Sequence, residues 1–492
     1  MYTFSSKLKT FSVILMILGI LGIGYGFLTA PKNTEEVEKI LAASEHGGHH
    51  AEAGHESKPE LKNIPAEVKH EVTEEHAAVA DTTATVADST HVETVAPPVA
   101  HQSVSKEKKH AEVDAHAEHE AHLKHVLNQL QNKPWAALYV ACIFFMLVTL
   151  GTLAFYAIQQ VAQAGWSPVL FRVNQGITAY LPVGSVIFFI LLLLCGMHYN
   201  HLFLWLDEGI TKEGSANYDR IIANKAGYLN FPFWIIRAAV FLLGWNLYRY
   251  FSRKNCLAQD ESNDDSFYKK NFNISAMFLV FFIVTESIMS WDWIMSIDPH
   301  WFSTLFGWYV FASFFVSGIT TICMVVIYLK SKGYLEHVNS SHIHDLAKYM
   351  FGFSVFWTYL WFAQFMLIWY ANIPEEVTYF VTRIELYNLP FFGAVVMNFV
   401  FPILILINTD FKRITWVLIM AGTVILLGHY IDFFNMIMPP TVGDQWFIGI
   451  PEISSVFFFL GLFIYVVFNA LTKAPLLPKR NPYIEESKHF HY

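Results

Sequence analysis

Ten apolar stretches of about 20 or more residues dominate this chain of 492 residues, of which only 15% are charged. A helix rises 1.5 Å per residue, so such a stretch can cross a hydrocarbon core about 30 Å thick. None shows the alternating pattern of a membrane β-strand. The chain is therefore predicted to be an all-α integral membrane protein with ten transmembrane helices. The predicted spans cover residues 7–29, 135–164, 169–197, 230–252, 271–296, 302–329, 344–371, 388–411, 413–438 and 451–471.

The basic residues test this count, because short cytoplasmic loops are enriched in Lys and Arg. With the N-terminus inside, the cytoplasmic side receives 17 of the 32 basic residues, and the short outer loops receive Lys212, Arg220, Lys225 and Arg383. A multi-pass protein with both termini in the cytoplasm is predicted. The first span has a longer apolar core than most signal peptides, so we expect it to be retained, with cleavage as the alternative.

Residues 31–134 differ from the rest of the chain, because they contain no Phe, Trp or Tyr and hold 13 of the 22 histidines. Such a segment cannot bury a core and is predicted to be a largely disordered periplasmic insertion. Its last part, residues 114–133, is rich in helix formers and is predicted to extend the second span. Metal binding and pH sensing by the histidines are alternatives to a solvated tether, and no metal site is predicted.

Spans two to five and six to nine run in the same directions, as expected for parallel repeats of one four-helix unit. LNFPF (229–233) matches YNLPF (387–391), and WDWIM (291–295) matches FFNMIM (433–438). Two parallel four-helix bundles with two peripheral helices are predicted. Chance similarity between aromatic-rich helix ends is the alternative. The predicted parts are the first helix (1–30), the insertion (31–134), the first bundle (135–300), the second bundle (301–440) and the tenth helix with its tail (441–492).

The cysteines of this chain exclude two kinds of redox centre. The four cysteines stand singly, without C-x-x-C or C-x-x-C-H, so neither c-type haem nor an iron–sulfur cluster is expected in this chain. A haem b needs paired axial histidines on facing helices, and the candidates are only His429 and His198 at the outer edge of span three, with His201 just outside. One haem b site is therefore the alternative. No nucleotide-binding loop occurs. The chain is therefore expected to bind no redox cofactor of its own.

Ionisable side chains inside the spans are the functional candidates, because each costs roughly 2.5–3.5 kcal/mol to insert. The helix rise places all of them between the midplane and the outer surface. They are Arg237 in span four, Glu286 and Asp292 in span five, His429 and Asp432 in span nine, and Glu452 at the start of span ten.

His429 and Asp432 are three residues apart and share a helix face, so they are expected to hydrogen-bond directly or through a water molecule. Such a pair suits a proton relay or the polar end of a quinone pocket. A buried pair that fastens span nine to its neighbours is the alternative. Arg237 is expected to pair with a carboxylate, for which Glu286 is the nearest candidate in depth. Glu286 and Arg237 are therefore further relay candidates.

Three segments carry a family pattern: WDWIMSIDPHWFSTLFGWY (291–309), KAGYLNFPFWIIR (225–237) and FWTYLWFAQFMLIWYANIPEE (356–376). They resemble the polysulfide-reductase (NrfD-like) membrane subunits of alternative complex III, the bacterial quinol:cytochrome c oxidoreductase. The resemblance covers most of residues 135–470. The histidine-rich insertion makes the chain more similar to the F subunits of that complex than to the C subunits.

The resemblance implies a respiratory assembly of the bacterial inner membrane. In it a quinol is oxidised, electrons pass through iron–sulfur clusters and c-type haems of partner subunits, and protons cross the membrane. The implied partners are a paralogous NrfD-like membrane subunit, a periplasmic iron–sulfur subunit, c-type cytochrome subunits and membrane lipids. No nucleic acid is expected.

One departure from the family affects the quinol site. The family's quinol pocket is associated with histidine and aspartate side chains in the first bundle, and residues 135–197 here contain no Asp, Glu or His. Quinol binding by this chain would use Asp292, Glu286 or Arg237.

The leading interpretation is a subunit of a redox complex that docks periplasmic partners and provides a proton route. The alternatives are a direct quinol-binding subunit, a secondary transporter with two parallel repeats, and a pure membrane anchor. The helix-end positions of Pro232, Pro390, Pro439 and Pro440 argue against a transporter.

Overall fold

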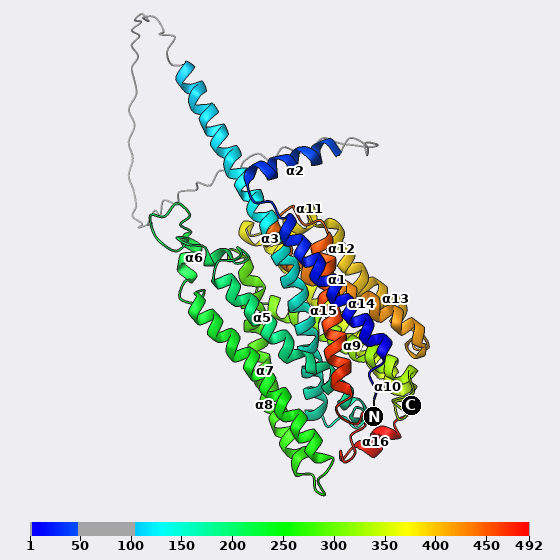
Figure 1. Cartoon of the computed structure of the whole chain (residues 1–492). Helices are drawn as coiled ribbons and strands as arrows, with labels where there is room; N and C mark the ends of the chain where they lie inside the picture. The colour runs from blue at the N-terminus through cyan, green and yellow to red at the C-terminus, as the bar shows by residue number, and fades with distance from the viewer. Residues whose placement is uncertain (1, 48–103, 492) are drawn as a thin grey trace, which may run out of the picture. The chain divides into compact units, whose positions relative to one another are not determined.

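The predicted helical architecture can be checked against a computed structural model of the chain (Figure 1). This structure describes residues 2–47 and 104–491, with side chains described over 2–42 and 119–491. Every regular element within these residues is helical, and none of them forms a strand. Ten helices in the described part are long and apolar enough to cross a membrane, which confirms the prediction of an all-α chain with ten candidate spans.

The ten candidate spans match the predicted ranges in order. Spans one to five are α1 (Ser6–Thr29), α3 (Val104–Val161), α4 (Phe171–Ile177) with α5 (Leu181–Gly196), α7 (Phe231–Gln259) and α8 (Ser266–Trp293). Spans six to ten are α9 (Phe306–Ser331), α10 (Ser340–Ala371), α12 (Asn388–Val395) with α13 (Phe401–Leu406), α14 (Thr415–Val442) and α15 (Ile450–Leu471). The shorter helices are α2 (Thr34–Gly47), α6 (Arg220–Lys225), α11 (Pro374–Glu385) and α16 (Ile484–Lys488).

The chain divides into two units, residues 33–124 and the remainder. The smaller unit contains α2, so the prediction of disorder is wrong for residues 34–47. Asn33 caps this helix by accepting the Glu36 N–H at 3.0 Å, and Glu35 and Glu36 favour its first turn. The start of α3 at Val104 confirms the helical extension predicted for residues 114–133. Residues 48–103, to which most of the disorder prediction applies, lie outside the described residues.

The centre of the larger unit is the pair α3 and α9, the most deeply buried spans. About 94% of the most apolar segment of α3 is buried, and about 89% of that of α9. Two glycines allow this close approach. A Cβ at Gly151 would lie 2.5 Å from the Phe314 carbonyl oxygen, and one at Gly318 would lie 2.7 Å from the Thr152 nitrogen. The two backbones therefore touch, as small residues permit between membrane helices.

Helix α1 packs along α15 through a second set of small residues. A Cβ at Gly19 would lie 2.5 Å from the Phe458 nitrogen, and one at Gly461 would lie 2.6 Å from the Ser12 carbonyl oxygen. Because these contacts leave no room for side chains, α1 is an integral packing partner of α15. This supports the prediction that the first span is retained.

Span eight is interrupted in its middle, which the sequence analysis did not anticipate. A π-helical turn over Val396–Val400 separates α12 from α13. Pro402 has no N–H to donate to the Asn398 carbonyl four residues earlier, and π turns widen a helix at such points. The amide atoms of Asn398 are buried and form no hydrogen bond in this structure.

The remaining contacts bring the candidate site residues together. Helix α7 packs against α8, while α9 and α12 pack against α14, and α10 packs against α9. Helix α8 also contacts the central helix α9. Arg237 and Asp292 thus lie on one helix pair, and His429 and Asp432 face α9 and α10. Figure 1 shows α7 and α8 running side by side.

Candidate functional site

The centre of the candidate site is the Ser313 hydroxyl on α9, which lies between His429 and Asp432 of α14. Its oxygen is 2.9 Å from His429 Nδ1 and donates to Asp432 Oδ2 at 2.8 Å. The two ionisable groups themselves are 3.9 Å apart, beyond direct hydrogen-bond distance. The prediction of a shared helix face is confirmed, and the Ser313 hydroxyl links the two groups in place of a direct hydrogen bond. A side chain from another span connects the pair.

Asp432 receives two further hydrogen bonds, from Tyr309 and Trp357. The Tyr309 hydroxyl on α9 donates to Asp432 Oδ1, and the Trp357 indole N–H on α10 donates to Oδ2 at 2.9 Å. Three donors from two helices therefore hold a carboxyl group that is only 2% exposed. Such donors compensate the loss of water around a charge in an apolar medium.

His429 has one nitrogen engaged and one without a partner. If Ser313 donates to Asp432, the hydroxyl must accept from a protonated His429 Nδ1, which leaves Nε2 as a bare acceptor. His429 Nε2 is buried and has no hydrogen-bond partner, and the planes of the imidazole and the Trp357 ring are at a right angle. The imidazole can therefore take up a proton at Nε2.

Other buried polar atoms without partners gather on the helices around this group. Helix α10 and the π turn both pack against their neighbours in this part of the fold. Buried polar groups are normally hydrogen-bonded, so atoms of this kind are candidate contacts for ordered water molecules. They are Ser354 Oγ and Gln364 Nε2 of α10, both amide atoms of Asn398, and Tyr430 Oη and Asn435 Oδ1 of α14.

A row of hydroxyl groups continues along α9 from Ser313. Ser317 donates to the Ser313 carbonyl at 2.7 Å, and Thr321 donates to the Ser317 carbonyl at 2.8 Å. These positions are one helical turn apart, so the row extends about 12 Å from Ser313 toward the far end of the helix. All three oxygens are buried and can still accept a hydrogen bond.

Arg237 pairs with Asp292, so the prediction that Glu286 is its partner is wrong. Arg237 Nε and Nη2 donate to the two oxygens of Asp292 at 2.7 and 2.9 Å. The guanidinium also lies 4.0 Å from the Tyr228 ring centroid and 4.2 Å from that of Phe233. Depth in the membrane suggested Glu286 as the partner. Asp292 lies six residues after Glu286 on α8 and points to a different side of that helix, the side that faces α7. The direction in which the side chain points therefore decides the pairing.

Further hydrogen bonds surround this pair. The Trp234 indole donates to the Asp292 backbone carbonyl at 2.9 Å, and the remaining Arg237 nitrogen reaches the Tyr228 carbonyl at 3.3 Å. Burial and the Asp292 charge raise the pKa of the Tyr228 hydroxyl, which therefore stays protonated. Each oxygen of Asp292 accepts one hydrogen bond from Arg237.

Glu286 is a buried acid with a free oxygen. Its Oε2 accepts from Ser287 at 3.1 Å, whereas Oε1 is buried without a partner. By the repeat alignment that pairs Met295 with Met438, Glu286 corresponds to His429. Glu286 and His429 were both predicted to belong to a proton relay. Among the described residues, no hydrogen bond joins Glu286 on α8 to His429 on α14. Glu286 therefore keeps one carboxyl oxygen without a hydrogen-bond partner.

Two further charged residues have local structural partners. Glu452 accepts the Gly449 N–H at 2.8 Å and caps α15. Arg383 of α11, which the sequence analysis placed in an outer loop, is buried. Its Nε donates to the Asn435 carbonyl at 3.0 Å, and its guanidinium lies over the Tyr379 ring at 3.3 Å.

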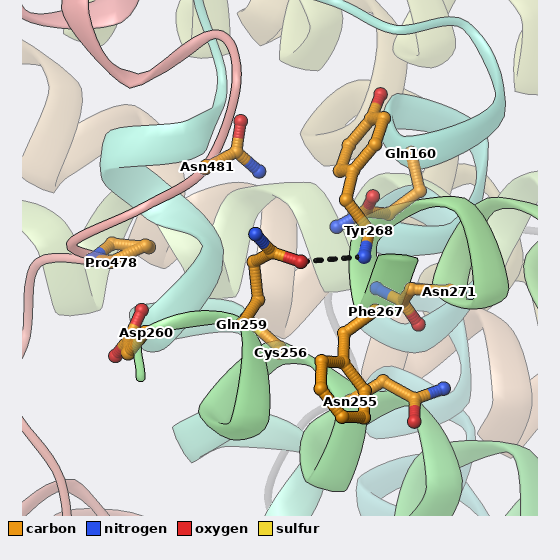
Figure 2. Close-up of a pocket in the computed structure, with 10 residues that line it drawn as sticks. All are labelled: Gln160, Asn255, Cys256, Gln259, Asp260, Phe267, Tyr268, Asn271, Pro478 and Asn481. Atoms are coloured by element: carbon orange, nitrogen blue, oxygen red, sulfur yellow. Dashed lines mark hydrogen bonds between the residues drawn. The ribbon is translucent and has the colours of Figure 1, made fainter. Parts of the chain in front are cut away.

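A second polar cluster, missed by the sequence analysis, surrounds the Tyr156 hydroxyl at the other end of α3. Gln160, Gln175 and Asn271 donate to this oxygen at 3.1, 3.2 and 3.1 Å. A cavity of about 10 Å³, enough for roughly one water molecule, lies beside Gln160 and Asn271 (Figure 2). The donor amides lie between four and 115 residues from Tyr156 along the chain, so no local sequence pattern joins them.

The structure offers no metal site within the side chains that it describes. No group of three or more His, Cys, Asp or Glu side chains there could hold a metal ion. Most histidines of the insertion lie outside those residues. The alternative that these histidines bind metal therefore stays a prediction. No protein-family model matches this sequence, and no curated protein matches it.

Proposed function

We propose that this chain is an NrfD-like membrane subunit of a bacterial respiratory quinol:cytochrome c oxidoreductase of the alternative complex III type. It carries a proton route through the second four-helix bundle, formed by spans six to nine. It docks periplasmic iron–sulfur and c-type cytochrome subunits beside a paralogous membrane subunit, and holds no redox cofactor of its own. The observation that supports the proton route is the chain His429–Ser313–Asp432 with its unpaired Nε2.

The proton transfer balances along these three groups. A proton arrives at His429 Nε2, and the Nδ1 proton passes to the Ser313 oxygen. The Ser313 proton then passes to Asp432 Oδ2. The result is a neutral histidine protonated at Nε2 and a neutral Asp432, so one proton has moved and no charge is stranded on serine. The buried, unpaired polar atoms of α10, the π turn and α14 supply water positions for delivery to Nε2.

The test measures protons moved per quinol oxidised by the purified assembly in sealed vesicles. His429→Ala and Asp432→Asn should leave the assembly and its quinol oxidation intact while proton movement falls. Glu452→Gln is the matched control, because Glu452 is as buried as Asp432 and forms no hydrogen bond with His429, Ser313 or Asp432. Unchanged proton movement in both site variants would remove the relay and leave the pure anchor.

The same purification tests the assembly. Co-purification with iron–sulfur and c-type cytochrome polypeptides is expected after gentle detergent extraction. Direct quinol binding is the alternative role within that assembly, and the free Glu286 oxygen favours it. Glu286→Gln should then raise the quinol concentration for half-maximal rate, whereas an unchanged value would exclude binding there.

A secondary transporter is the second candidate, and the π turn in span eight favours it. Transporters commonly interrupt helices where they bind ions or substrates. The two functions separate at the purification step, because a transporter would be isolated without c-type cytochromes. Uptake of a solute by vesicles that contain this chain alone would support the transporter and contradict the redox assembly.

A further inference from the structure

An apolar groove on the surface of the larger unit lies between α5 and α7. It has a volume of about 420 Å³, within the range of small-molecule sites. Val186 and Leu243 on its walls are 61% and 62% exposed in the isolated chain. In a bilayer these side chains face acyl chains, so the groove opens to lipid.

The groove becomes polar at one end. Asn246 of α7 donates to Ser185 Oγ of α5 at 2.9 Å, and its own Oδ1 is buried without a partner. Arg249 and Arg253 follow on α7 after three and seven residues, on the same face of the helix. They lie about 27 and 33 Å along the helix from Phe231, so they reach the headgroup level of the opposite membrane surface.

These two arginines form a positive site that protein groups do not neutralise. Neither forms an ion pair with a carboxylate among the described residues. Arg253 reaches only the Gln175 carbonyl, at 3.5 Å, and Arg249 Nε is buried without an acceptor. The nearby Asp260 is occupied, because it accepts from Arg172 at 2.5 Å.

We propose that this groove and the guanidinium groups of Arg249 and Arg253 bind one anionic phospholipid of the cytoplasmic leaflet. An acyl chain fills the groove, and the phosphate accepts hydrogen bonds from the two arginines. Guanidinium groups suit phosphate because they present paired N–H donors. The leaflet follows from the positive-inside topology, and basic pockets between helices on that side bind anionic headgroups. The site is independent of the proton route.

The experiment measures lipid binding to the full-length protein, in the assembly as purified, by native mass spectrometry. Phosphatidylglycerol should bind at least tenfold more tightly than phosphatidylcholine with the same acyl chains. Each of Arg249→Gln and Arg253→Gln should weaken phosphatidylglycerol binding about fivefold. Lys332→Gln is the matched control, because it removes one charge from an exposed residue on the same predicted side of the membrane, at the end of α9 and not on the helices that form the groove. Its binding should match that of the wild type.

Two further measurements test the site without an arginine variant. Val186→Trp fills the groove from an exposed position and should weaken binding of both lipids. Inorganic phosphate should not displace phosphatidylglycerol at equal concentration, because it lacks the acyl chain. Equal binding of the two lipids, arginine variants that bind lipid as well as Lys332→Gln does, or displacement by phosphate would overturn the proposal. A partner helix found in the groove would overturn it too.

Discussion

Arg237 donates to both carboxylate oxygens of Asp292, at 2.7 and 2.9 Å, and the carboxylate is fully buried. Removing one partner leaves the other as an uncompensated charge, which costs about 3–5 kcal/mol in a buried pair. Arg237→Gln and Asp292→Asn should each lower the thermal unfolding midpoint of the purified protein.

Arg237→Lys tests the geometry of the same pair. A lysine keeps the charge but cannot present the two-pronged donor, so it should recover only part of the lost stability. The substitution Lys212→Gln, at an exposed outer position, is the control for loss of a positive charge. Midpoints equal to that control would show that the pair does not stabilise the fold.

The contact between α3 and α9 predicts opposite effects of two alanine substitutions. Gly151→Ala would place a Cβ 2.5 Å from the Phe314 carbonyl oxygen, and such overpacking costs about 1–3 kcal/mol. Gly352→Ala has no atom within 4 Å of the new Cβ and gains up to about 1 kcal/mol in helix propensity. Thermal unfolding of both variants checks the prediction, and equal midpoints would contradict the close contact.

Ser313→Ala removes the bridge between His429 and Asp432 without changing either group. Asp432 would keep two of its three donors, so we expect a loss of about 1–3 kcal/mol in stability. Under the proposed function, proton movement per quinol should fall as well. Thr149→Ala is the control, because this buried hydroxyl bonds only to its own helix, at the Met146 carbonyl. Proton movement equal to that of Thr149→Ala would exclude Ser313 from the route.

The predicted topology can be tested with single cysteines at exposed loop positions. The four native cysteines are buried and should not react. Lys212→Cys lies in a predicted outer loop and Glu261→Cys in a predicted inner loop, and both positions are exposed. A membrane-impermeant maleimide should label the first in intact cells and the second only after the membrane is opened. The reverse pattern would invert the topology.

The packing of α1 on α15 predicts that the first span remains in the mature protein. A Cβ at Gly22 would overlap the Ser454 side chain, at 1.8 Å from its hydroxyl oxygen. Losing α1 would expose this face of α15 to lipid. The intact mass of the purified chain should include residues 1–29, and a mass that lacks them would show a cleaved signal peptide.

The number of spans and their order were predictable from the sequence, because helix length and hydropathy are local properties that a bilayer enforces. The candidate ionisable residues followed from the same argument, since a charge inside a span is costly wherever it points. The shared face of His429 and Asp432 was also predictable, because helical periodicity fixes the relation of residues three apart.

Only the tertiary structure decided which groups compensate those charges. Ser313 is 116 residues from His429, and Arg237 is 55 residues from Asp292, so no local pattern joins them. The choice of Asp292 over Glu286 depends on the rotation of α8 about its axis, which is set by packing against α7 and α9. Depth in the membrane follows from counting residues, whereas partnership depends on helix rotation and crossing, which the sequence of one span does not contain.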